Sequence, residues 1–168
     1  MAVGKSIGKQ LNYGYPGSFA IQPDQLTVTR VSVDEEIPFG ACLVYDDTVS
    51  DGVKVAKATF NMAKFAGVAS RIVKQPESYV NQNKVGYLKD EAVTVFQRGI
   101  ITVECIKGTP GLNKDVWWVY DGTDTENKIG FAAEEVVGKS VKLANVKFVG
   151  DADANGCTAI NLLTKQNV

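Results

Sequence analysis

The stretch AVTVFQRGIITVECIKG, residues 92–108, decides which fold class this chain favours. It is rich in Val, Ile, Thr and Phe, which suit a pleated, half-buried strand, and apolar and polar positions alternate along part of it. Polar Gln97 and Arg98, followed by Gly99, interrupt the apolar run. The pattern predicts two strands, Ala92–Phe96 and Ile100–Ile106, joined as a hairpin.

On both sides of this stretch, short β-prone runs recur between turn residues. The chain contains 16 glycines and five prolines, many of them between apolar runs. Strands that recur with turns between them favour a sandwich or barrel over a helical or βαβ architecture. We therefore predict an all-β fold, an antiparallel sandwich or barrel with at most two short helices. The further predicted strands are Leu26–Val31, Ala41–Tyr45, Val53–Ala56, Gly67–Val73, Val116–Tyr120, Val141–Val149 and Cys157–Leu163.

Two segments have a composition that suits helices. Lys57–Ala66 contains Ala, Met and Lys, which favour helix. Phe131–Val137 is followed by Gly138, a residue suited to a helix C-cap. We expect one short helix in each.

The motif Asp151-Ala-Asp-Ala-Asn-Gly156 matches the first half of an EF-hand calcium loop. Such a loop needs a bidentate glutamate at its twelfth position, where this chain has Leu162, and its flanks should be helices, whereas these look like strands. Asp, Asn and Gly tolerate left-handed backbone and cap nearby amides. A turn is the favoured interpretation, with an ion site at Asp151–Asn155 as the alternative.

Composition argues against several classes of function. The 168 residues suit one domain and carry a formal net charge of −1, with no basic cluster for nucleic acid or membrane. Histidine is absent, so the commonest general base and metal ligand is missing. Each of the three cysteines, Cys42, Cys105 and Cys157, lies within an apolar run and outside any CxxC pair, which is typical of buried thiols in a reducing compartment.

The chain contains only partial matches to catalytic motifs. Gly138-Lys-Ser140 resembles the end of a P-loop, but Ala133 stands where the earlier glycine is required. Paired carboxylates can act without histidine, and they occur at Glu134-Glu135, Asp34–Glu36 and Asp46-Asp47. The sequence alone does not show whether any two of these groups converge in a cleft. We expect no enzyme and no cofactor, and the N-terminus lacks the apolar core of a signal peptide, so we expect synthesis in the cytoplasm.

Residues 1–25 differ from the rest of the chain. They combine four glycines and two prolines with Tyr13, Tyr15 and Phe19, and they hold Lys5 and Lys9 with no acid before Asp24. This composition suits neither a regular strand nor an inert linker. We predict an extended N-terminal arm over residues 1–25 that lies against a partner, and a single β-rich domain over residues 26–168.

The tandem Trp117-Trp118 predicts a surface of contact. Adjacent residues of a strand point to opposite faces, so the two indoles cannot share one core. One is expected in the interior, and the other in a second layer or against a partner, where tryptophan is enriched. A buried two-sided strand is the alternative.

Several phrases taken in order resemble a known family. They are Asn12-Tyr-Gly-Tyr-Pro-Gly-Ser-Phe19, Glu36-Ile-Pro-Phe-Gly40, Lys64-Phe-Ala-Gly-Val-Ala-Ser-Arg71, Ala92-Val-Thr-Val-Phe-Gln-Arg-Gly99 and Gly150-Asp-Ala-Asp-Ala-Asn-Gly156. Over nearly the whole chain, the sequence resembles the capsid cement, or head-decoration, proteins of tailed bacteriophages.

The resemblance implies a β-rich, non-catalytic protein that binds the outside of the expanded capsid and bridges capsomers. The implied partners are the major capsid protein and further copies of the chain, a trimer in preference to a dimer. The implied location is the outer capsid surface of the virion. Together with the composition, it makes Tyr13, Tyr15, Phe19, Trp117 and Trp118 the candidate contacts. The competing hypothesis is a carbohydrate- or receptor-binding β-module in which one tryptophan stacks on a sugar.

Overall fold

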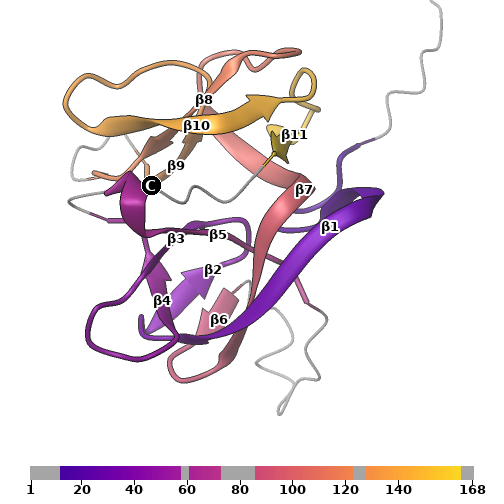
Figure 1. Ribbon diagram of the computed structural model, residues 1–168. Helices are drawn as coiled ribbons and strands as arrows, with labels where there is room; N and C mark the ends of the chain where they lie inside the picture. Colours follow the sequence, from indigo (N-terminus) through magenta and orange to yellow (C-terminus); the bar gives the residue numbers. More distant parts are fainter. Residues whose placement is uncertain (1–11, 58–60, 73–85, 123–127, 164–168) are drawn as a thin grey trace, which may run out of the picture.

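The computed structural model describes residues 12–57, 61–72, 86–122 and 128–163 (Figure 1). These residues form strands and the segments that connect them, and their helical part is the short 3-10 turn η1, Met62–Lys64. No helix in the described ranges has the length and apolar character needed to cross a membrane. The predicted all-β fold with at most two short helices is confirmed for this part of the chain.

The described part of the chain contains eleven strands. In chain order they are β1 (Phe19–Ser32), β2 (Glu36–Pro38), β3 (Cys42–Tyr45), β4 (Gly52–Val55), β5 (Phe65–Ala69), β6 (Gly86–Leu88), β7 (Ala92–Lys107), β8 (Asp115–Val119), β9 (Gly130–Ala132), β10 (Ser140–Phe148) and β11 (Cys157–Leu162).

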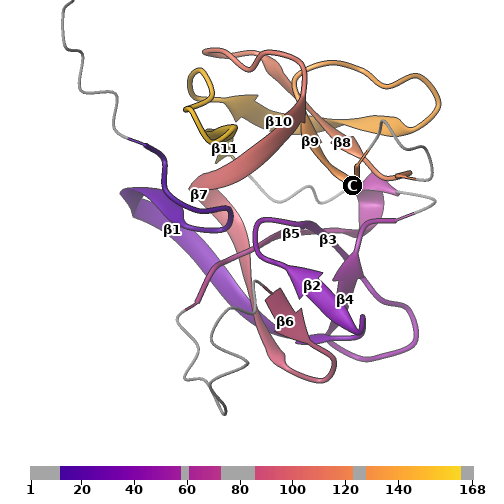
Figure 2. The same cartoon turned by 180° about the vertical axis from the view of Figure 1, so that it is seen from behind.

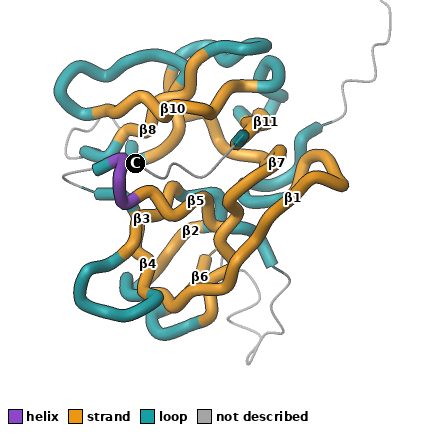
Figure 3. The backbone as a smooth tube through the Cα atoms, viewed as in Figure 1, coloured by secondary structure: helices purple, strands orange, loops and turns teal. Residues whose placement is uncertain are grey.

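Nine of these strands form one sheet that closes on itself twice. β1, β4, β3, β5 and β7 pair in that order, and β1 pairs back with β7 to complete the first barrel. β7, β11, β10, β8 and β9 pair in turn, and β9 pairs back with β7 to complete the second barrel. Figures 1 and 3 show β7 running from one barrel to the other. The pairings are antiparallel as predicted, except for β1 with β4 and β7 with β9, which are parallel.

The hairpin predicted within residues 92–108 is wrong, because β7 is one 16-residue strand. Gly99 has a φ of +114°, which residues other than glycine rarely tolerate. A Cβ at this position would lie 2.2 Å from the carbonyl oxygen of Asp24. Residues 22–25 bulge out of the pairing between β1 and β7 at this point. The glycine therefore admits a bulge of the neighbouring strand and does not reverse the chain.

The predicted helix at Phe131–Val137 is wrong, and within the described residues the one at Lys57–Ala66 is present only as the 3-10 turn Met62–Lys64. Phe131 and Ala132 belong to β9, where Phe131 pairs with Trp118 and is 1% exposed. At the other segment, Phe65 and Ala66 are buried in β5, and residues 58–60 lie outside the described residues. Burial of these apolar side chains between strands outweighs a weak helix propensity, which differs by well under about 1 kcal/mol per residue.

A separate two-stranded ribbon, β2 and β6, packs against the first barrel, as Figure 2 shows. Ile37 and Tyr87 pair across it, and both are fully buried. The Tyr87 hydroxyl donates a 2.6 Å hydrogen bond to the carbonyl oxygen of Ser70, just after β5. The ribbon thereby fixes the segment that leads from residue 34 into β3.

The first described residues connect the two barrels. The Gly17 amide donates to the carbonyl oxygen of Thr102 on β7 at 2.8 Å, and the Arg71 amide donates to the Gly17 carbonyl at 2.7 Å. β1 begins at Phe19, so the predicted boundary between residues 25 and 26 falls inside that strand. Residues 1–11 lie outside the described residues, and the division into an arm of residues 1–25 and a domain of residues 26–168 stays a prediction.

Candidate functional site

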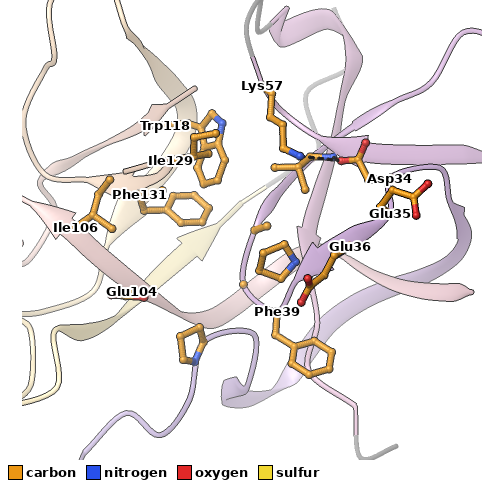
Figure 4. Close-up of a pocket in the computed structure, with 16 residues that line it drawn as sticks. Asp34, Glu35, Glu36, Phe39, Lys57, Glu104, Ile106, Trp118, Ile129 and Phe131 are labelled. Atoms are coloured by element: carbon orange, nitrogen blue, oxygen red, sulfur yellow. Dashed lines mark hydrogen bonds and ion pairs between the residues drawn. The ribbon is translucent and has the colours of Figure 1, made fainter. Parts of the chain in front are cut away.

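A groove with a volume of about 620 Å³ lies between the two barrels (Figure 4). The second barrel contributes an apolar wall that includes Ile106, Trp118 and Phe131. The facing wall includes Phe39, from the segment between β2 and β3, and Pro16, from the segment before β1. The volume is in the range of about 300–1,000 Å³ that is usual for ligand sites, so we treat this inter-barrel groove as a candidate binding site.

The rims of the inter-barrel groove are acidic. Asp34, Glu35 and Glu36 line one side and Glu104 of β7 lines the other, with Lys57 as the cation among the lining residues. The Lys57 ammonium lies 3.6 Å from the Asp34 carboxylate. Glu35 forms a 3.5 Å ion pair with Lys89. For the exposed carboxylates of Glu36 and Glu104, the described residues supply no cation.

Trp118 closes the floor of the groove and links the barrels. Its indole is 2% exposed, and its Nε1 donates a 2.8 Å hydrogen bond to the carbonyl oxygen of Ala56, which follows β4. The ring packs edge-to-face on Phe131, with centroids 4.9 Å apart. Because a buried indole N–H needs a partner, this bond holds the second barrel against the first at the base of the groove.

The Trp117 side chain lies on the opposite face of β8, as strand geometry requires. It is half-buried and packs beside a small cluster of Val119, Ala132 and Val136. The interior member of the tryptophan pair is therefore Trp118. Neither indole is exposed, so the structure does not supply the exposed sugar platform that the carbohydrate-binding hypothesis used.

Tyr15 is linked to the groove by Arg71, which contacts both Tyr15 and the lining residue Phe39. The Arg71 guanidinium lies 4.5 Å from the centroid of the Tyr15 ring and 5.4 Å from that of Phe39. Tyr15 itself is 66% exposed. A cation between two aromatic faces gains electrostatic stabilisation from both, and the stack leaves a flat aromatic surface open to a partner.

A second apolar surface follows β1 and the end of β11. We call it the β1 patch and define it as Phe19, Ile21, Leu26 and Leu163, all of them exposed. Ile21 and Leu163 share a hollow of about 260 Å³ with Ile100 of β7. Clustered exposed apolar side chains mark interaction sites more often than scattered ones do.

Tyr13 is held by the turn that resembles a calcium loop. The Asp153 carboxylate accepts the amide of Tyr13 at 3.0 Å, and also the amides of Asn155 at 2.9 Å and Cys157 at 3.0 Å. Burial disfavours the charged form of Asp153, but these three amide donors outweigh it and hold the carboxyl pKa below its usual value. The predicted turn is confirmed, and its second aspartate binds the N-terminal segment.

The sequence-predicted contact residues fall into separate places. Tyr15 and Trp118 both adjoin the inter-barrel groove, Phe19 belongs to the β1 patch, and Tyr13 and Trp117 lie elsewhere. Sequence analysis missed the groove residues that face each other. The cluster at residues 34–36 was visible as carboxylates, but nothing local indicates that Glu104 lies across from it.

In the described ranges, no three or more Cys, Asp or Glu side chains gather in a way that could hold a metal ion. Burial raises the pKa of the Cys42, Cys105 and Cys157 thiols. A protonated thiol is a weak nucleophile.

Two comparisons with known proteins give matches over nearly the whole chain. Residues 3–163 match the family described as "Structural cement protein (E217 gp24/Pam3 gp6)". A chain in the solved structure titled "The capsid of Myoviridae Phage XM1" has a TM-score of 0.73 and 14% identity, over 99% of this chain and 100% of that one. At 14% identity, this structural likeness shows a shared fold and nothing more. None of the curated proteins matches the chain.

Proposed function

The chain belongs to the phage structural cement protein family, and from this premise we propose that it binds the outer surface of the expanded capsid and bridges neighbouring capsomers without catalysis. Its partners in this proposal are the major capsid protein and further copies of itself, a trimer in preference to a dimer. It acts in the virion after synthesis in the host cytoplasm.

The observation that carries the proposal is the β1 patch. Ile21, Leu26 and Leu163 are each at least half exposed, and an apolar surface of this kind gains free energy when a partner covers it, about 25 cal/mol per Å². The exposed Tyr15 on Arg71 offers a further rigid contact with little conformational entropy to lose. We assign Tyr13, Tyr15 and Phe19 to contacts with the capsid or a neighbouring copy, and Trp117 to contacts between copies.

Binding alone, without a catalysed reaction, is enough to reinforce the capsid lattice. A protein that binds the assembled lattice and not its separated subunits stabilises the lattice by its own binding free energy. Each copy that spans two capsomers adds avidity, because its second contact forms at a high effective concentration. Contacts that are weak singly can therefore strengthen a head that carries many copies.

The test uses expanded heads that lack this protein, decorated in vitro with purified full-length chain. Heads with the wild-type chain should withstand a higher temperature and a stronger osmotic shock than bare heads. The double variant Ile21→Ser/Leu163→Ser should fold, because both side chains are already exposed, and should decorate heads poorly. Val137→Ser, at an 86% exposed position on a turn, is the matched control and should decorate normally.

Two results would contradict the proposal. Bare and decorated heads of equal robustness would show that the chain does not reinforce the capsid. Full decoration by the Ile21→Ser/Leu163→Ser variant would remove the β1 patch as the contact surface.

A further inference from the structure

We propose that the inter-barrel groove binds residues 1–11 of a second copy of this chain, so that neighbouring copies exchange their N-terminal segments. The inference deepens the self-association included in the proposed function. It does not depend on capsid binding, and its test therefore needs only the isolated protein.

The inter-barrel groove has the chemistry to bind a segment that is both apolar and basic. Its floor contains Trp118 and Phe131, which are almost fully buried, and its edge contains Ile129, which is 36% exposed. Glu36 on β2 and Glu104 on β7 stand on opposite rims, and the described part of the chain provides neither with a cation. An occupant with apolar side chains in the middle and positive charges on both sides would fit.

Residues 1–11, MAVGKSIGKQL, have this composition. They contain Lys5 and Lys9 and no acidic residue, and Ile7 lies midway between the two lysines. In an extended bound segment, residues 5, 7 and 9 point to the same face, with about 7 Å between successive side chains. Ile7 would enter the apolar floor of the inter-barrel groove while the two lysines reach the acidic rims. On the other face, Gly4, Ser6 and Gly8 are small enough to let the segment lie flat.

A second copy, and not the same molecule, is the proposed donor because of where the described chain begins. Pro16 lines the groove, but from there toward its N-terminus the chain leaves the groove, and the Tyr13 amide is bonded to Asp153 in the loop between β10 and β11. The segment before Tyr13 thus starts from a point held outside its own groove. Eleven extended residues span up to about 36–40 Å, so the segment can extend well away from that point.

This exchange also predicts a geometry of assembly. A segment that enters the groove of the next copy makes a head-to-tail contact, and such contacts form rings when the rotation closes. A closed ring of three copies agrees with the trimer preference in the proposed function. Two copies that exchange segments reciprocally form the dimeric alternative.

The experiment measures the association of full-length chains by sedimentation at several protein concentrations. The variant Lys5→Glu/Lys9→Glu carries an acidic segment and an acidic groove, and the variant Glu36→Lys/Glu104→Lys carries a basic segment and a basic groove. Each alone should associate about tenfold or more weaker than wild type, because attraction becomes repulsion at two exposed sites. Glu135→Lys, an exposed charge reversal outside the groove, is the control and should associate like wild type.

Mixing the two variants distinguishes a second copy from the same molecule. Each segment then finds an oppositely charged groove on the other variant, so the mixture should form mixed assemblies at concentrations where each variant alone associates only weakly. Ile7→Ser should weaken the association of the otherwise wild-type chain by about tenfold or more, because it removes the apolar contact.

The inference is overturned if the wild-type chain stays monomeric at every concentration, if Lys5→Glu/Lys9→Glu associates like wild type, or if the mixed variants fail to combine. Docking of the segment within its own molecule would produce the last result. None of these outcomes would bear on capsid binding, which the decorated heads test separately.

Discussion

Replacing Asp153 by asparagine should loosen the N-terminal segment while leaving both barrels folded. One oxygen of the Asp153 carboxylate accepts the amides of Asn155 and Cys157, and the other accepts the amide of Tyr13. The asparagine side chain keeps a single oxygen, which the two turn amides will occupy. Its NH₂ group then faces the Tyr13 amide, so that two donors meet where a donor and an acceptor met before.

The cost follows from the bonds that change. A hydrogen bond to a charged group contributes about 1.5–3 kcal/mol, and a neutral one about 0.5–1.5 kcal/mol. Losing the bond to Tyr13 and neutralising the acceptor of the other two should lower the free energy of unfolding by about 2–3 kcal/mol. The segment stays tied to β7 through the backbone bonds between Gly17 or Ser18 and Thr102, so global unfolding is not expected.

Urea unfolding measures the total loss, and hydrogen exchange at the Tyr13 amide shows where it arises. Exchange at Tyr13 should accelerate far more than exchange at amides within β7. Asp151→Asn removes the same charge from an exposed neighbour with no hydrogen bond recorded among the described residues, and it should change stability by less than about 0.5 kcal/mol. If Asp153→Asn is no more costly than this control, or if Tyr13 exchange does not change, then Asp153 does not hold the segment.

Further expectations concern packing and pH. In urea unfolding, Gly17→Ala should lower the free energy of unfolding by more than about 2 kcal/mol, because its Cβ would lie 2.8–2.9 Å from three backbone atoms at a φ of +81°. Gly14→Ala, at a φ of +89° with nothing within 4 Å of its Cβ, should lower it by only about 1 kcal/mol. Equal costs for the two variants would refute the close approach at Gly17. Trp118→Ala should cost about 3–5 kcal/mol of fold stability, whereas Trp117→Ala should cost less and weaken association in sedimentation; two equal losses of fold stability would place both indoles in the core. Because the pKa of Asp153 is lower in the folded than in the unfolded chain, its stabilisation is complete above the unfolded pKa of about 4 and is lost as pH falls through the folded pKa. Acid unfolding curves should therefore show a smaller loss below about pH 4 for Asp153→Asn than for wild type, and parallel curves would contradict this assignment.

The sequence by itself determined the elements whose signal is local. Alternation and β-branched residues located strands such as Cys157–Leu162 and Ser140–Phe148 to within about a residue, because side-chain period and propensity act over a few neighbours. The Asp151–Gly156 turn was equally readable, since Asp and Asn cap amides close to them in sequence. Three-residue strands such as β9 were missed, because so short a run carries no period.

Only the tertiary structure decided how these strands close and what they enclose. β7 continues through Gly99 because a bulge of β1 packs against it there, and no residue near Gly99 carries that information. The two closures depend on β1 and β9 reaching the same strand from distant parts of the chain. The inter-barrel groove follows from these two closures. Glu36 and Glu104 face each other across it although 68 positions separate them in sequence. Trp118 lies at its floor, where its indole donates a hydrogen bond to Ala56. Local patterns specify which face of a strand is buried, whereas long-range pairing decides which strands meet and therefore where a binding surface forms.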